Sequence, residues 1–148
     1  FLRAIWHLAC YITKWTADCD RRLHRLMCYV KSTYEYRLTG WVGDDLADLR
    51  CHLYSDADFA GCQATNKSTT GAFLSIEGPN TMFPITMMSK KQTCVSHSTP
   101  EAEIVAIDTA IQKTGMPAMD LWNTVLQRIV EIEYMEDKSC LCTNHYDR

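Results

Sequence analysis

Three acidic residues of this 148-residue chain are spaced so that they could share divalent cations. Asp56 follows an alternating apolar segment, Glu103 lies early in an expected helix, and Asp137 follows a later β-like segment. Mg²⁺ takes oxygen ligands and is typically held by a few carboxylates, water and substrate phosphates. In two-metal nucleases such ions activate the attacking water and stabilise the leaving oxygen. Taken alone, however, acidic residues at strand ends and in first helical turns are more often solvated or capping groups.

Period-two alternation predicts the strand that carries the first carboxylate. Over residues 49–56 one face is apolar and the other is polar: Leu49, Cys51 and Leu53 against Arg50, His52, Tyr54 and Asp56. Asp56 is therefore expected to end this strand on its polar side. Two more strands are predicted at 69–76 and 81–88, and the connecting residues EGPN (77–80) suit a tight turn. Three sequential strands with short connections predict an antiparallel meander.

A helix is predicted to begin at Ser98, because Ser98, Pro100 and Glu101 form the pattern of a capping box with an early proline. Its expected buried stripe is isoleucine: Ile104, Ile107 and Ile111. At 100° per residue, Glu103 then falls at the edge of the stripe and is aimed toward the sheet, whereas Glu101 points away.

A second helix is predicted at 117–127, followed by a fourth strand through Val130, Ile132 and Tyr134 that ends at Glu136 and Asp137. The order β-β-β-α-α-β predicts an α/β chain of the α+β kind with a mixed sheet. In that arrangement Asp56, Glu103 and Asp137 converge at one end of the sheet.

The leading segment has a different character. Apolar residues at i, i+3, i+4 and i+7 predict an amphipathic helix at 20–31, packed by Leu23, Leu26, Met27 and Val30. Residues 33–42 are rich in aromatic and β-branched side chains and predict a strand, with a boundary near 43–48. We therefore expect two units, residues 1–46 and 47–148.

The net charge of −3 is unevenly distributed. Residues 1–43 hold seven Lys/Arg against three Asp/Glu, whereas residues 44–148 hold eight against fifteen. A basic leading segment would fit a surface that follows phosphates, but solvated faces of both signs would explain the same counts. No apolar run is long enough to span a membrane, and no secretory signal is evident, so the eight cysteines are expected to be reduced and intracellular.

Four separated segments carry a specific resemblance: LYSDADFAG (53–61), KSTTG (67–71), SKKQ (89–92) and SHSTPEAE (96–103). In order and spacing, over about residues 50–137, they resemble the signatures of ribonuclease H domains from copia-type LTR retrotransposon polyproteins. The upstream helix and strand are similar to the end of the preceding reverse transcriptase region. The resemblance implies a ribonuclease H-like fold that hydrolyses the RNA strand of RNA/DNA hybrids during reverse transcription, by two-metal catalysis with Mg²⁺ or Mn²⁺.

By this resemblance Asp56 corresponds to the family's first catalytic aspartate, Glu103 to its helix glutamate and Asp137 to the aspartate after the fourth strand. Five further residues are expected to contact nucleic acid: Ser68, Thr69, Lys90, Lys91 and Ser98. Each also has a plain alternative, since the lysines would be solvated and the hydroxyl residues would serve a strand or a helix cap. The partners implied are the hybrid and the reverse transcriptase region of the same polyprotein, in cytoplasmic virus-like particles or the nucleus.

The chain departs from the family pattern after Asp137, where it reads KSCLC and then ends at Arg148. The expected fold is therefore truncated after the fourth strand, without the fifth strand or the fourth carboxylate. Asp147 follows Asp137 too closely to replace that carboxylate. The alternative function is accordingly a catalytically inactive ribonuclease H-like remnant that serves as a binding or structural module.

Overall fold

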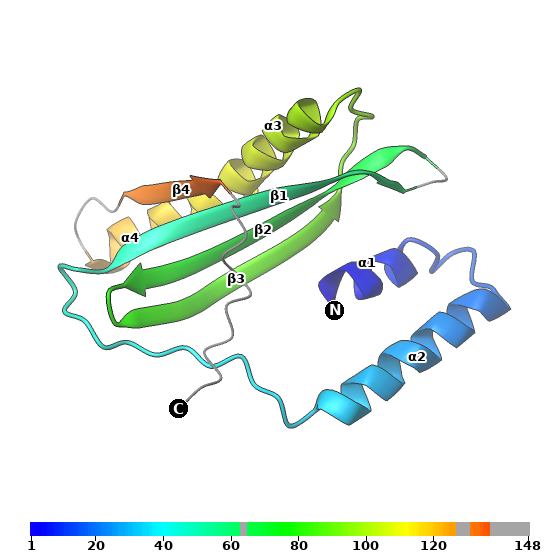
Figure 1. Ribbon diagram of the computed structural model, residues 1–148, viewed down its shortest axis with the longest axis horizontal. Helices are drawn as coiled ribbons and strands as arrows, with labels where there is room; N and C mark the ends of the chain where they lie inside the picture. Colours follow the sequence, from blue (N-terminus) through cyan, green and yellow to red (C-terminus); the bar gives the residue numbers. More distant parts are fainter. Residues whose placement is uncertain (63–64, 127–130, 137–148) are drawn as a thin grey trace.

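The computed structural model describes residues 1–62, 65–126 and 131–136, and its elements mix α and β structure (Figure 1). Two helices come first, α1 (Leu2–Ala9) and α2 (Ala17–Thr33). The rest of the chain consists of β1 (Arg50–Cys62), β2 (Lys67–Gly78), β3 (Thr81–Lys91), α3 (Thr99–Ala110), a π-helical turn (Ile111–Gly115), α4 (Met116–Leu126) and β4 (Ile132–Glu136). The predicted order β-β-β-α-α-β is confirmed.

The four strands form one mixed sheet in the order β3-β2-β1-β4. The first three strands make the predicted antiparallel meander, and β4 returns through α3 and α4 to pair in parallel with β1. Both of these helices lie on the same face of the sheet (Figure 1). We call the opposite face the open face; α1 packs near it, against β3.

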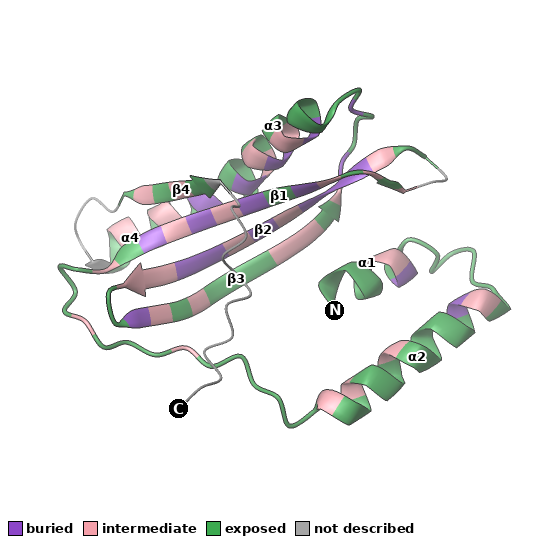
Figure 2. Ribbon diagram, viewed as in Figure 1, coloured by how far each residue is buried: buried purple, intermediate pink, exposed green. Residues whose placement is uncertain are grey.

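Alternation along β1 separates the two faces of the sheet, as predicted. Every second residue is buried on the helix side: Cys51, Leu53, Ser55 and Ala57. Leu53 packs with Ala72, Leu74 and Ala110 in the main core, where an apolar contact contributes by removing its surface from water. Figure 2 shows the same distribution, with buried residues concentrated in β1 and β2 while α2 is mostly exposed.

The expectation that Asp56 ends its strand is wrong, because β1 continues to Cys62. Pairing with β2 runs on past Asp58, and its register then shifts before Cys62 pairs with Lys67. Ala60 lies within this irregularity and has a left-handed backbone, with φ of 50°. A bulge of this kind breaks the period-two pattern, so alternation in the sequence stops before the strand does.

The isoleucine stripe expected for α3 is also wrong. The buried residues are Ala102, Ala106 and Ala110, whereas the side chain of Ile104 is 66% exposed. Alanines at i, i+4 and i+8 share one helix face, and their small side chains let the helix approach the sheet closely. Ala102 and Ala106 thereby contact Ala57 of β1 in a second core cluster.

The leading segment is only partly as predicted. Helix α2 covers the expected residues, but Met27 is 55% exposed and Cys19 is the buried residue that α2 contributes. The strand expected at 33–42 is wrong: only Trp41 pairs there, through two backbone hydrogen bonds with Met82 of 2.9 and 3.1 Å. The segment crosses the edge of β3 at one point, and β-propensity alone cannot supply a strand with a partner.

Candidate functional site

Asp56 lies on the open face of β1, between two strands. It pairs with Gly71 of β2, and its neighbour Ser55 pairs with Glu136, the last residue of β4. Asp56 is exposed and lines a shallow hollow of about 240 Å³ together with Tyr54, Gly71 and Phe73. The first predicted carboxylate is thus accessible at the point where β4 ends.

Glu103 lies on α3 and is half-buried, whereas Glu101 is exposed. Both positions agree with the prediction, although the stripe beside Glu103 is alanine. The Oε2 atom of Glu101 accepts a 2.7 Å hydrogen bond from the backbone N–H of His97, and Ser98 Oγ accepts one of 3.3 Å from the N–H of Glu101. Glu101 therefore works as a cap for the start of the helix, as the capping box predicts.

The contact of Ala57 with Ala102 and Ala106 brings α3 over β1 beside Asp56. Asp56 is adjacent to Ala57 in the chain, and Glu103 is adjacent to Ala102, so both carboxylates flank one packing contact. The two carboxylates lie on different sides of this contact, because Asp56 faces the open face of the sheet whereas α3, which carries Glu103, covers the opposite face. A cation bound by both would have to lie at the free edge of β1 beyond β4.

The third predicted ligand, Asp137, lies outside the described residues. Within residues 1–62, 65–126 and 131–136, no three His, Cys, Asp or Glu side chains are grouped so that they could hold a metal ion. The described part of the chain supplies Asp56 beside the end of β4 and Glu103 on α3, and carboxylates suit Mg²⁺ by ligand type. The three-carboxylate site itself stays a prediction.

The four signature segments are joined to one another by side-chain hydrogen bonds. Ser68 Oγ of the second segment accepts from the N–H of Ala60 in the first, at 3.1 Å. Gln92 Nε2 of the third donates to Thr70 Oγ1 at 3.2 Å and to the carbonyl of Ala102 in the fourth at 2.8 Å. Ser68, Thr70 and Gln92 are all buried, so this network fixes the bulged end of β1, the end of β3 and the start of α3 relative to one another.

Gly61 of the first segment also has a steric role. A Cβ at this position would lie only 2.0 Å from Asp58 Oδ2 and 3.0 Å from the guanidinium of Arg3, which forms an ion pair with Asp58. A side chain there would displace this pair. The pair in turn joins α1 to the bulged end of β1.

The residues expected to contact nucleic acid differ in how far they are buried. Ser68 is fully buried, so its expected contact is replaced by the structural role just described. Thr69 is also buried, at 8% exposure. Ser98 caps α3, and Lys91 Nζ lies 3.0 Å from Cys62 Sγ. Lys90 is exposed at the end of β3, where it remains available to a phosphate.

A polar cluster on the open face was not anticipated from the sequence. His52 Nδ1 lies 3.1 Å from Glu77 Oε2, and His52 Nε2 lies 3.4 Å from Glu133 Oε2. Tyr54 donates its hydroxyl hydrogen bond to the same Glu77 carboxylate, and so does Ser75. The two ring nitrogens of His52 face different carboxylates, so one metal ion could not bind both. The cluster instead links β4 to the middle of the sheet.

In comparisons with protein-family models, curated proteins and solved structures, nothing matches this chain. None of the helices in the described part of the chain has both the length and the apolar character that crossing a membrane requires.

Proposed function

We propose that this chain is a ribonuclease H-type endonuclease with a ribonuclease H-like fold, which hydrolyses the RNA strand of RNA/DNA hybrids. The observation that carries the proposal is the hydrogen-bonded network of the four signature segments. Segments that lie between residues 53 and 103 of the sequence meet at the end of the sheet where Asp56 and Glu103 flank the β1–α3 contact. Such a network gives those sequence signatures a shared physical purpose, which is to position the carboxylate-bearing elements.

The metal in this proposal is Mg²⁺, with Mn²⁺ as the alternative. Asp56 and Glu103 would hold it, together with Asp137, and oxygen ligands of this kind match its preference. When bound, the metal would supply an activated water and would stabilise the charge on the leaving oxygen. The protein's own contribution is to keep Asp56 accessible on a paired strand and to hold Glu103 on a helix that its alanines fix against β1.

In this proposal the chain distinguishes the RNA strand of the hybrid from DNA by its 2′-hydroxyl groups, which DNA lacks. Lys90, exposed at the end of β3, would contact a phosphate and so position the strand without reading its sequence. A retrotransposon origin, and a reverse transcriptase region upstream of residue 47, belong to the same proposal.

The test is cleavage of a labelled RNA/DNA hybrid in Mg²⁺ or Mn²⁺, with duplex DNA and duplex RNA of the same sequence as controls. We expect metal-dependent cleavage of the RNA strand of the hybrid alone, and loss of this cleavage in Asp56→Asn. If the folded wild-type chain cuts none of the three substrates, the alternative of an inactive ribonuclease H-like module takes its place. Cleavage that survives in Asp56→Asn would instead indicate a contaminating nuclease.

A further inference from the structure

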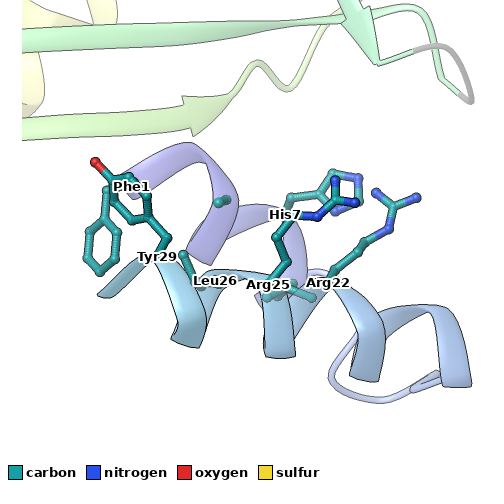
Figure 3. Close-up of a pocket in the computed structure, with 8 residues that line it drawn as sticks. Phe1, His7, Arg22, Arg25, Leu26 and Tyr29 are labelled. Carbon is teal, nitrogen blue, oxygen red and sulfur yellow. The ribbon is translucent and has the colours of Figure 1, made fainter. Parts of the chain in front are cut away.

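A groove between α1 and α2 is lined by residues of these two helices and by none of the predicted catalytic carboxylates. It has a volume of about 430 Å³, and its floor is apolar, formed by Ala4, Leu8 and Leu26. Figure 3 shows two aromatic rings, Phe1 and Tyr29, at one end and the cationic side chains at the other. The ring centroids of Phe1 and Tyr29 are 6.5 Å apart, and Tyr29 is 55% exposed, so a flat group could reach these rings.

The charged side chains of this groove are two arginines of α2, Arg22 and Arg25. His7 lines it from α1, and none of its lining residues is acidic. Among the residues that the structure describes, Arg25 has no carboxylate within ion-pair distance, so its guanidinium is available to an external anion. Arg25 and Tyr29 are four residues apart on one helix face, which places a cation next to an aromatic ring.

Arg22 also binds Asp18, through a hydrogen bond of 2.5 Å. Hydrogen bonds from Arg22 and then from Arg21 hold the pKa of Asp18 below its ordinary value. Asp18 thus offsets part of the charge of Arg22, and Arg25 is the groove-lining arginine that has no ion pair with a described carboxylate. Two smaller hollows share His7 and Arg22 with it; one adds Arg3, which is paired with Asp58, and the other adds Lys14 and Asp18.

We infer that the α1–α2 groove binds a single strand of nucleic acid. Arginines at one end of the groove and exposed aromatic rings at the other suit a strand that offers both phosphates and flat bases. An acidic peptide would use the arginines but would leave Phe1 and Tyr29 without a stacking partner. The inference does not depend on the proposed hydrolase activity, because the groove contains none of the carboxylates assigned to cleavage and binding requires no metal.

The experiment measures the binding of a fluorescein-labelled 15-nucleotide (dT) strand to the full 148-residue chain by fluorescence anisotropy, in EDTA so that cleavage plays no part. The test variants are Arg25→Ala, Arg25→Lys and Tyr29→Leu. The matched control is Lys31→Ala, which removes the same charge from α2 at a position about 180° around the helix from Arg22. Circular dichroism confirms that each variant is folded.

We expect Arg25→Ala to weaken binding severalfold and to reduce the salt dependence of log K by about 0.7, as for one lost phosphate contact on a single strand. Arg25→Lys should recover most of the affinity. Tyr29→Leu should weaken binding about tenfold, since it removes a stacking ring but keeps an apolar side chain. Lys31→Ala should remain within about twofold of wild type, because its charge is remote from the groove.

Three outcomes would overturn the inference. Equal losses in Lys31→Ala and Arg25→Ala would show attraction to overall charge and not to the groove. Unchanged binding in Tyr29→Leu would show that bases do not stack on the ring of Tyr29. Competition by poly-glutamate as effective as that by unlabelled (dT) strand would identify an acidic protein segment as the preferred occupant.

Discussion

The side-chain amide of Gln92 lies 2.8 Å from the carbonyl oxygen of Ala102, so the end of β3 is bonded directly to the first turns of α3. The same amide nitrogen donates to Thr70 on β2, and the amide oxygen, Oε1, accepts a 3.3 Å hydrogen bond from the Ser96 hydroxyl. One buried residue thus connects three elements. Its environment explains how a polar glutamine can be buried directly after β3: buried polar groups need partners, and Gln92 has them.

Replacement of Gln92 by leucine should destabilise the fold. The change leaves the buried Thr70 hydroxyl and the Ala102 carbonyl without this donor, and an unsatisfied buried group costs about 1–3 kcal/mol. The free energy of unfolding, measured by urea denaturation, should fall by that amount. Gln112→Leu is the control, because Gln112 is exposed and its amide donates to Asp108 of the same helical segment; its effect should stay within about 0.5 kcal/mol. Equal effects of the two changes would contradict the structural role of Gln92.

Ala106→Leu should also destabilise the protein, by about 1–3 kcal/mol, because a larger side chain would be forced between α3 and β1. Ala106 is fully buried against Ala57 and Ala102. Ile104→Ala, on the exposed face of the same helix, should change the free energy of unfolding by no more than about 0.5 kcal/mol. Thermal or urea unfolding of both variants decides which face of α3 is buried, and the reverse ranking would restore the isoleucine stripe.

Glu103→Gln should abolish the proposed cleavage of RNA/DNA hybrids while leaving the fold intact. Loss of a metal ligand removes several kcal/mol of transition-state stabilisation, so the rate should fall about a thousandfold. Glu101→Gln is matched to it in chemistry and lies two residues away, but its side chain caps the N–H of His97. This control should retain most of the wild-type rate. If Glu101→Gln were the more damaging change, the catalytic glutamate would be misassigned.

Stability at low pH should depend on Asp44. Partial desolvation raises the pKa of this group, but hydrogen bonds involving Thr81 and Asn80 outweigh that effect, and the pKa lies below its ordinary value of 3.8. A lowered pKa means that the ionised form favours folding. The stability contributed by Asp44 should therefore be present above about pH 4 and be lost as the pH falls through the folded-state pKa. Unfolding curves of wild type and Asp44→Ala should differ at pH 7 and converge as the pH falls well below 3.8.

Among the cysteines that the structure describes, Cys51 should react most slowly with alkylating reagents. Burial raises the pKa of its thiol, and the thiolate is the reactive form, so at pH 8 less of it is available. Mass spectrometry after iodoacetamide treatment should show Cys94, which is exposed, modified more than about a hundredfold faster than Cys51. Unfolding in urea should bring the two rates together. Comparable rates in the folded chain would place Cys51 outside the core.

Much of the fold followed from local pattern. The alternation in β1, the turn at Pro79 and Asn80 between β2 and β3, and the cap at Ser98 were all predicted and confirmed, because each depends on neighbouring residues and on backbone geometry alone. The position of Glu103 beside the buried stripe and of Glu101 away from it was predicted for the same reason. Helical periodicity fixes the angle between Glu101 and Glu103 around the helix axis, whichever side chains form the buried face of the helix.

Other features depended on contacts between distant segments. The sequence alone determined the order of the strands and helices from residue 49 onward and the positions of the four signature segments. Only the tertiary structure decided that alanines bury α3, that Ser68 supports a bulge, and that His52 lies between Glu77 and Glu133. The physical reason is that each of these contacts joins elements that are distant in the sequence. Their register and separation depend on how the strands and helices pack together, which no single segment determines.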